Sequence, residues 1–308
     1  MENVSDITEI EAGAPETGAA IAVSRSRFAD FVELAKPRLN FLVLITTAVG
    51  FYMAARSGTH WVVLVHALIG TALTAGGASA LNQLIERDHD ARMPRTRKRP
   101  LPAGRVMALE ALAFGSILGI VGVAYLLVMV NALTAALGAF TLLSYIFVYT
   151  PLKRLTTLNT IVGAVPGAIP PVMGCTAAGG VLTPEAVALF GILFFWQMPH
   201  FLAIAILYRD DYARGGFKML PVVDPTLETT GRQILVYGMA LIPVSLLPSV
   251  LHATGAIYFT AAMLLGLAFL SFGVSCAATR SRTDARKLFF ASIIYLPLLL
   301  AFMMIDKT

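Results

Sequence analysis

The sequence has few charged residues. Only 13% of its 308 residues are Asp, Glu, Lys or Arg, whereas 57% are hydrophobic. This composition lies far from that of soluble globular domains. It excludes a cytosolic enzyme, a disordered chain and a secreted disulfide scaffold, and it predicts a protein that is embedded in a lipid bilayer.

Cysteine is rare, and the common nucleotide and protease motifs are absent. The two cysteines, Cys175 and Cys276, lie in apolar runs, so they predict small core residues rather than a disulfide framework or a Cys-based metal site. The sequence contains no Walker A motif, no strand-to-helix glycine fingerprint, no HExxH and nothing that resembles a Ser-His-Asp site. Any phosphate group must therefore be recognised by side chains and metal rather than by a glycine loop.

Nine apolar segments follow one another along the chain, and each approaches the length that crosses a bilayer. Runs this long and continuous indicate helices, because the strands of a membrane barrel would be short and alternating. The segments are residues 39–55, 61–84, 106–130, 132–150, 158–178, 185–208, 232–250, 255–276 and 287–305. We therefore predict an all-α, polytopic membrane protein with nine transmembrane helices.

The amino-terminal region differs from these segments. We predict a disordered cytoplasmic tail over residues 1–27, because this stretch is mostly polar and acidic and has no apolar run long enough for a signal peptide. An amphipathic pattern then predicts a short helix along the membrane surface, which ends at Pro37. The rest of the chain, residues 28–308, is expected to form a single domain.

The basic residues gather in alternate links between the predicted spans. Of the 23 lysine and arginine residues, only Arg56 and Lys307 fall in the other set of links and ends. Basic residues bias a link toward the cytoplasm. We therefore predict that the amino terminus lies inside the cell and the carboxyl terminus outside.

The link after the second span is too rich in charge to be explained by topology alone. If the second helix continues past the membrane edge, Asn82, Glu86 and Asp90 lie four residues apart on one face. Hard oxygen ligands in this arrangement suit Mg²⁺ that is shared with a phosphate-bearing substrate. Five cationic residues follow within residues 92–99. The alternative interpretation is a solvated charge run that faces the lipid.

A second charged link follows the sixth span, on the same predicted side. Asp210 and Asp211 are adjacent and are flanked by Arg209 and Arg214, a pattern that by itself would also suit helix caps and surface ion pairs. Together the two links predict a site that surrounds a diphosphate. In such a site, acids hold the metal and bases neutralise the leaving group.

Polar and irregular segments inside the predicted spans indicate a ligand chamber. His200 lies in the sixth span, where an ionisable side chain is costly and is by default a candidate for function; substrate contact and helix packing are the two alternatives. The fifth span begins near Asn159 and has six Gly or Pro residues within positions 163–174. We expect this span to be kinked, closely packed and next to a cavity.

With these motifs the sequence resembles the UbiA superfamily of intramembrane prenyltransferases. The first signature of that family, an Asn followed by two acids at four-residue intervals, matches Asn82, Glu86 and Asp90. The segments that narrow the resemblance to the branch that farnesylates haem are residues 95–102, 149–154, 196–201, 211–212 and 219–221.

The resemblance implies nine helices around a central cavity, Mg²⁺ as cofactor, and farnesyl transfer from farnesyl diphosphate to a vinyl group of haem B. The expected catalytic and metal-binding residues are Asn82, Glu86, Asp90 and Asp211, with Asp210 as a further metal ligand. The expected diphosphate-binding residues are Arg95, Lys98, Lys153, Arg154 and Arg209, and the expected haem-contacting residues are His200 and Asn159. The lipid bilayer of a cell inner membrane, haem A synthase and oxidase assembly factors are expected partners, and nucleic acid is not.

Two other functions stay open at this point. A relative with an aromatic acceptor, such as a quinone precursor, would share the diphosphate machinery. A transporter would need charges along a path through the membrane, whereas here they crowd one face. Many superfamily members also have a second pair of aspartates four residues apart, and that spacing falls here on Tyr208 and Tyr212. It is therefore open which of Asp210 and Asp211 binds metal.

Overall fold

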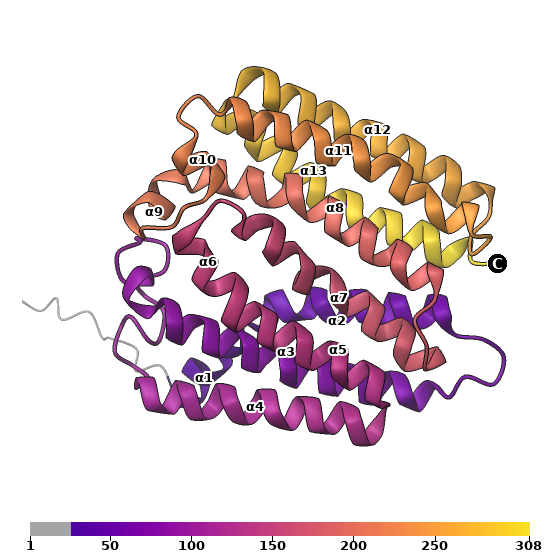
Figure 1. The fold of residues 1–308 in the computed structure, drawn as a ribbon, viewed down its shortest axis with the longest axis horizontal. Coiled ribbons are helices and arrows are strands. Elements are labelled where there is room, and N and C mark those ends of the chain that lie inside the picture. The colour runs from indigo at the N-terminus through magenta and orange to yellow at the C-terminus, as the bar shows by residue number, and fades with distance from the viewer. Residues whose placement is uncertain (1–25) are drawn as a thin grey trace, which may run out of the picture.

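The computed structural model describes residues 26–308. The secondary-structure elements in this range are all helices (Figure 1). Nine helical stretches of the described chain are long and apolar enough to cross a membrane, which confirms the predicted fold class. They are α2 (Pro37–Ala54), α3 (Trp61–Asp90), α4 (Ala108–Met129), the stretch Ala132–Leu155, α7 (Asn159–Gly179), α8 (Pro184–Leu207), α11 (Glu228–Val250), α12 (Ala256–Thr279) and α13 (Arg282–Ile305). The predicted tail, residues 1–27, lies outside the described residues apart from its last two.

The fourth span is interrupted. It consists of α5 (Ala132–Leu143), the π-helical turn η1 (Ser144–Tyr149) and α6 (Thr150–Leu155). A π-helical turn widens the helix locally and is frequent at functional sites. Here it leads directly into the short α6, which carries Lys153 at the end of the bundle.

A short helix, α1 (Arg27–Ala35), precedes the first span, as the amphipathic pattern predicts. Its inner face buries Leu34, which lies in one apolar cluster with Ala80 of α3. The helix ends at Ala35; Lys36 follows with a left-handed backbone (φ 49°), and Pro37 begins α2. Lys36 is therefore held at the corner between two helices, next to α3.

The two charged links lie at the same end of the bundle. This end comprises residues 91–107, α6, and residues 208–227 with the short helices α9 (Arg209–Arg214) and α10 (Leu220–Val223); we call it the charged end. Figure 1 shows it at the left, whereas the carboxyl-terminal residues lie at the opposite end of the bundle.

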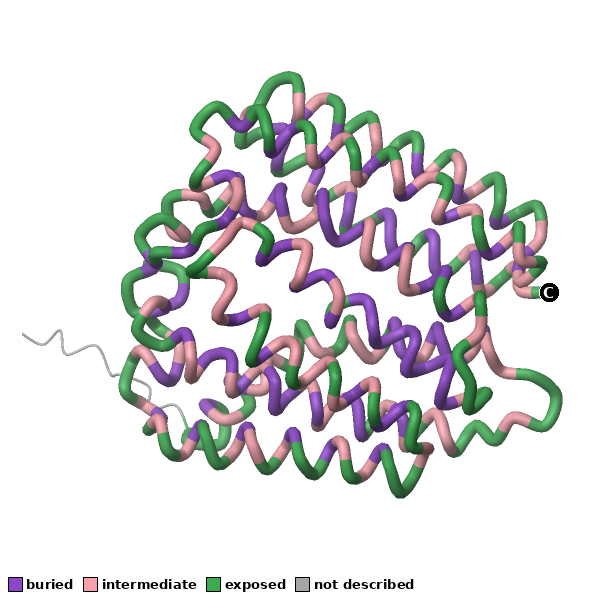
Figure 2. The backbone as a smooth tube through the Cα atoms, viewed as in Figure 1, coloured by how far each residue is buried: buried purple, intermediate pink, exposed green. Residues whose placement is uncertain are grey.

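The spans differ in how deeply they are buried. In the most apolar window of α7, 67% of the residues are buried inside the protein, and in that of α8 61%, compared with 22% for α4 and 28% for α12 (Figure 2). α7 and α8 therefore form the centre of the bundle, and the exposed apolar side chains of the outer helices are suited to contact lipid. Cys175 and Cys276 are both buried and unpaired, as predicted.

Close approach of α2 and α7 confirms the prediction that the fifth span is closely packed, while the expected kink stays a prediction. A β-carbon placed on Gly174 would lie 1.9 Å from the backbone oxygen of Thr47, and one on Gly50 would lie 1.9 Å from the backbone oxygen of Pro171. Glycine is thus required on both sides of this crossing, because no side chain fits between the two backbones.

We expect Gly174→Ala to lower the free energy of unfolding by about 1–3 kcal/mol, because its methyl group would force the α2 and α7 backbones apart. The matched control is Gly179→Ala, at the end of the same helix, where an added β-carbon meets nothing within 4 Å. Thermal unfolding of the detergent-solubilised proteins measures the difference. Equal melting temperatures for the two variants would contradict the close crossing.

Candidate active site

The last turns of α3 present a buried polar face at the charged end. Asn82, Glu86 and Asp90 are 2%, 6% and 1% exposed, and all three belong to one continuous helix that ends at Asp90. The second span therefore continues past its apolar part, as the four-residue spacing required. Two carboxylates in such a place are tolerated only where cations compensate them.

Each carboxylate is paired with a base from a different link. Lys153 Nζ of α6 donates to Glu86 Oε1 at 2.7 Å, and Arg99 Nη1, from the link after α3, donates to Asp90 Oδ2 at 2.6 Å. Lys153 Nζ also lies 4.4 Å from the centroid of the Tyr149 ring. Both bases are mostly buried, so these ion pairs are screened much less by water than surface pairs are.

A third cation completes the group. Lys36 Nζ donates to Asn82 Oδ1 at 3.3 Å, and Asn82 Nδ2 donates to Thr150 Oγ1 at 3.1 Å. Burial, with a smaller contribution from Arg99, lowers the pKa of Lys36 to about 7, although Glu86 opposes this shift. An anion bound next to Lys36 would favour its charged form. The buried group then holds three cations against two carboxylates, which suits an anionic ligand.

The oxygen atoms of this group fit a divalent cation only in part. Within residues 26–308, no three His, Cys, Asp or Glu side chains lie close enough together to hold a metal ion. The two carboxylates and the Asn82 amide are nevertheless hard oxygen donors, which Mg²⁺ accepts when phosphate and water supply its remaining ligands. These residues therefore fit Mg²⁺ that arrives with a diphosphate, rather than a metal held by protein alone.

The second charged link lies against the first. Lys218 N donates to the Lys153 backbone oxygen at 2.7 Å, and Asn159 Nδ2 donates to the Lys218 backbone oxygen at 3.0 Å. His89 Nδ1 lies 2.6 Å from the Gly215 backbone oxygen. An apolar cluster joins the same two links beneath these contacts, formed by Met93, Ala205, Phe217 and Met219. The two links therefore form one cap over the bundle.

The two aspartates of this link have different surroundings. The Asp211 side chain is 12% exposed and forms an ion pair with Arg214. The Asp210 side chain is 62% exposed and pairs with Arg282, which also holds the pKa of Asp210 below its usual range. Asp211 is thus the better placed of the two for a role inside the cap, while Asp210 joins the cap to α13.

The predicted diphosphate-binding bases do not all lie together. Lys153 contacts the acidic face of α3, as described, and Arg154 lies beside it, with Nη1 3.3 Å from His89 Nε2. The Arg95 guanidinium carbon lies 5.0 Å from the centroid of the Tyr208 ring and 5.8 Å from that of Tyr212. Arg95 and Tyr212 therefore connect the first link to the second, and the aromatic rings occupy the position where aspartates were expected from the family pattern.

Two of the predicted bases have other surroundings. Lys98 is exposed, and its backbone oxygen accepts a hydrogen bond from Arg105 at 3.0 Å. Arg209 Nη1 donates to the Pro225 backbone oxygen at 3.4 Å. Within residues 26–308, neither side chain forms a hydrogen bond or ion pair with an acid of α3. In the basic run of residues 92–99, Arg99 is the base that pairs with such an acid, Asp90.

Sequence reasoning did not identify Lys36, Arg99 and Thr150. Nothing local in the sequence distinguishes Lys36 from the other basic residues near the membrane surface, which topology alone explains. Arg99 belongs to a run of cations in which no spacing rule selects one member. Its partner Asp90 lies nine residues earlier, across a series of turns that only the folded link defines.

His200 and Asn159, the predicted haem contacts, are both held by hydrogen bonds. Asn159 is fully buried, and its amide nitrogen donates to two backbone oxygens, those of Thr156 and Lys218. It therefore anchors the second link. His200 Nδ1 lies 2.7 Å from Ser292 Oγ of α13. Whether either residue touches haem stays a prediction.

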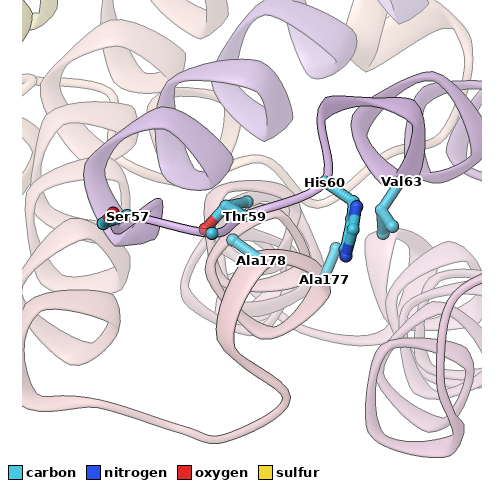
Figure 3. Close-up of a pocket in the computed structure, with 7 residues that line it drawn as sticks. Ser57, Thr59, His60, Val63, Ala177 and Ala178 are labelled. Atoms are coloured by element: carbon cyan, nitrogen blue, oxygen red, sulfur yellow. The ribbon is translucent and has the colours of Figure 1, made fainter.

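A cavity at the opposite end of the bundle has a different character. It has a volume of about 270 Å³ and lies between the link from α2 to α3 and the end of α7 (Figure 3). Its described lining brings together one histidine and small or apolar side chains, without a carboxylate: Ser57, Gly58, Thr59, His60, Val63, Ala177 and Ala178. This cavity therefore lacks the paired acids and bases that the charged end brings together.

The fold and the site together define a membrane-embedded transferase. The chain belongs to the UbiA prenyltransferase family, whose family model matches residues 43–294. It is 50% identical over 287 residues to the protoheme IX farnesyltransferase of Solibacter usitatus, with 90% of this chain and 98% of that protein covered. It is 46% identical over 289 residues to the protoheme IX farnesyltransferase of Koribacter versatilis, with 91% and 93% covered.

Solved structures confirm the fold. The chain is similar to a digeranylgeranylglyceryl phosphate synthase, with a TM-score of 0.75 and 15% identity over 91% of this chain and 98% of that one. It is also similar to a UbiA homologue from Archaeoglobus fulgidus that was solved with GPP and Mg²⁺, with a TM-score of 0.64 and 16% identity over 89% and 99%. At these identities the likeness establishes a shared helical architecture.

We expect Arg99→Gln to lower the free energy of unfolding by about 2–3 kcal/mol, because it leaves the buried Asp90 carboxylate without its cation. Lys98→Gln, the adjacent substitution with the same charge change, should alter it by less than about 0.5 kcal/mol. Chemical unfolding in detergent compares the two variants. A larger effect at Lys98 than at Arg99 would show that the ion pair with Asp90 is assigned to the wrong base.

Proposed function

We propose that the protein transfers a farnesyl group from farnesyl diphosphate to a vinyl group of protohaem IX (haem B), which forms haem O and releases diphosphate. The observation that carries the proposal is the group of three bases around two buried carboxylates at the end of an apolar helical bundle. The bundle suits an isoprenoid tail, and the charged end suits its diphosphate. The family of the chain and the names of its curated relatives support the same reaction.

The residues at the charged end divide into two roles in this proposal. Glu86, Asp90 and Asn82, with Asp211 of the second link, would hold Mg²⁺. The bound ion would neutralise the negative charge that develops on the leaving diphosphate. On binding, Lys153 and Arg99 turn from the carboxylates to the diphosphate oxygens. Lys36 beside Asn82 is a third base for these oxygens, with Arg95 and Arg154 at the rim. Lys98 and Arg209 are the outermost candidates for binding the diphosphate.

Chemistry then proceeds away from water. The bond between C1 of the farnesyl group and the diphosphate oxygen breaks, and the apolar bundle shields the resulting allylic cation from premature quenching. The haem vinyl group forms the new carbon–carbon bond to C1. Water then adds to the benzylic-type carbon of the former vinyl group and releases one proton. The residues of the charged end act mainly by stabilising the departing diphosphate electrostatically.

The proposal also specifies how the protein is oriented in the membrane. The charged end holds the basic links, so it faces the cytoplasm, and the carboxyl terminus lies outside a cell inner membrane. Farnesyl diphosphate then enters from the cytoplasmic face. Haem O leaves through the bilayer toward haem A synthase or oxidase assembly factors.

Glu86→Gln and Asp90→Asn should each lower kcat by about 10²–10³. Each substitution removes one carboxylate ligand of the Mg²⁺ that would stabilise the departing diphosphate. Asp88→Asn is the matched control on the same helix, since that side chain is 75% exposed and pairs with Arg87. Turnover of farnesyl diphosphate in detergent measures the effect, and thermal unfolding of each variant separates lost chemistry from lost fold. Near-wild-type turnover in Glu86→Gln would reject this assignment.

Purified protein incubated with haem B, farnesyl diphosphate and Mg²⁺ should yield a product with the mass of haem O. Chelation of Mg²⁺ should abolish the product, and added Mg²⁺ should restore it, because the acids of α3 alone do not form a complete metal site. Mass spectrometry of parallel reactions with a hydroxybenzoate-type acceptor tests the rival function. A prenylated benzoate in place of haem O would establish the rival.

A further inference from the structure

His200 of α8 and Ser292 of α13 face each other in the halves of these helices next to the charged end. His200 Nδ1 lies 2.7 Å from Ser292 Oγ, and Ser292 Oγ lies 2.5 Å from the Phe289 backbone oxygen. A carbonyl oxygen can only accept, so the single hydroxyl hydrogen of Ser292 is donated to Phe289. Ser292 must therefore accept its other hydrogen bond, and His200 Nδ1 must carry a hydrogen.

This hydrogen bond fixes the tautomer of His200. A neutral imidazole has one N–H, so when Nδ1 carries it, Nε2 has a free lone pair. No partner of Nε2 is recorded among residues 26–308, whereas Nδ1 is held by Ser292. The intermediate exposure of His200 leaves part of the ring accessible.

Aromatic side chains hold the ring in place. The His200 ring stacks on Trp196, with centroids 4.9 Å apart and planes at 21°, and lies 5.2 Å from the ring of Phe289. Trp196 Nε1 donates to the Ser292 backbone oxygen at 2.9 Å, which ties α8 to α13 at the same level. The ring is therefore oriented from both helices, with its Nε2 edge left unpartnered.

We propose that His200 Nε2 binds the iron of the haem substrate, and that Ser292 is the positioning residue that keeps the imidazole in the tautomer able to do so. This inference rests on the proposed function, in which haem is the acceptor. Histidine is a common ligand of haem iron, and its other ring nitrogen is typically held by a hydrogen bond of this kind.

The contacts favour coordination over proton transfer. The chain of hydrogen bonds from Nδ1 ends at the Phe289 carbonyl, which cannot pass a proton on. The recorded neighbours of the ring are aromatic or hydroxyl groups, and no carboxylate is recorded against it in the described part of the chain. An imidazolium would thus lack a counter-charge at membrane depth. Coordination of iron leaves the histidine neutral.

The first test compares ferric haem B with metal-free protoporphyrin IX as ligands of the purified protein. The wild type should show a histidine-ligated haem absorption spectrum and should bind haem at least about tenfold more tightly than the metal-free porphyrin. His200→Ala should lose both properties, and added imidazole should restore the spectrum. His66→Ala is the matched control, because His66 is also intramembrane with Nδ1 2.8 Å from a hydroxyl, that of Tyr125, but lies in the half of α3 remote from the charged end.

The second test addresses Ser292. Ser292→Ala should raise the KM for haem about 10–100-fold and should leave the KM for farnesyl diphosphate unchanged, because the change acts through the iron ligand. Ser292→Thr keeps the hydroxyl and should retain the wild-type haem spectrum. Equal losses for both substrates in Ser292→Ala would indicate a structural role and would overturn the positioning assignment.

The outcomes separate this inference from the proposed function. Suppose that the wild type forms haem O, and that His200→Ala binds haem with an unchanged spectrum and an unchanged preference over protoporphyrin IX. The assignment of His200 as the iron ligand is then wrong, and the proposed function stands. If wild type prenylates a hydroxybenzoate-type acceptor and leaves haem unmodified, the proposed function fails, and the inference fails with it.

Discussion

Two almost fully buried carboxylates, those of Glu86 and Asp90, are tolerated only where cations lie within hydrogen-bond distance. Lys153 and Arg99 meet this requirement, and they come from two links that are distant in sequence. The last turns of α3 can therefore form only when both links return to the same end of the bundle. The charge pairs thus determine how the loops are arranged, although the apolar spans supply the bulk of the structure.

The same pairs explain how the site can bind a charged substrate without being assembled anew. In the proposed function, cations already oriented toward carboxylates would only exchange those oxygens for the oxygens of a diphosphate, and the carboxylates would then become available to a metal. Lys36 adds a base that loses little by being neutral in the free protein and gains charge beside an anion. Preorganised charge of this kind avoids reorganisation at the moment of reaction.

Much of this arrangement could be predicted because it is local in sequence. Hydrophobic runs identify the nine spans, and a four-residue spacing places Asn82, Glu86 and Asp90 on one helix face. The remainder depends on pairs far apart in the chain. Lys36 meets Asn82, Lys153 meets Glu86 and His200 meets Ser292 across separations of 46, 67 and 92 residues. No periodicity carries that information, and a run of adjacent cations gives no reason to prefer Arg99 to Lys98.

Topology and chemistry make use of the same basic residues, so one explanation does not exclude the other. Lys153 and Arg154 are sufficient as a signal for cytoplasmic orientation, and from sequence that explanation would end the matter. Yet the Lys153 side chain is only 14% exposed and lies against Glu86, whereas Arg154 is exposed beside His89. A residue needed only for orientation would gain nothing from burial, since desolvation of a cation costs energy. Burial therefore distinguishes the base that contacts the acids of α3 from its neighbour, which stays exposed at the rim.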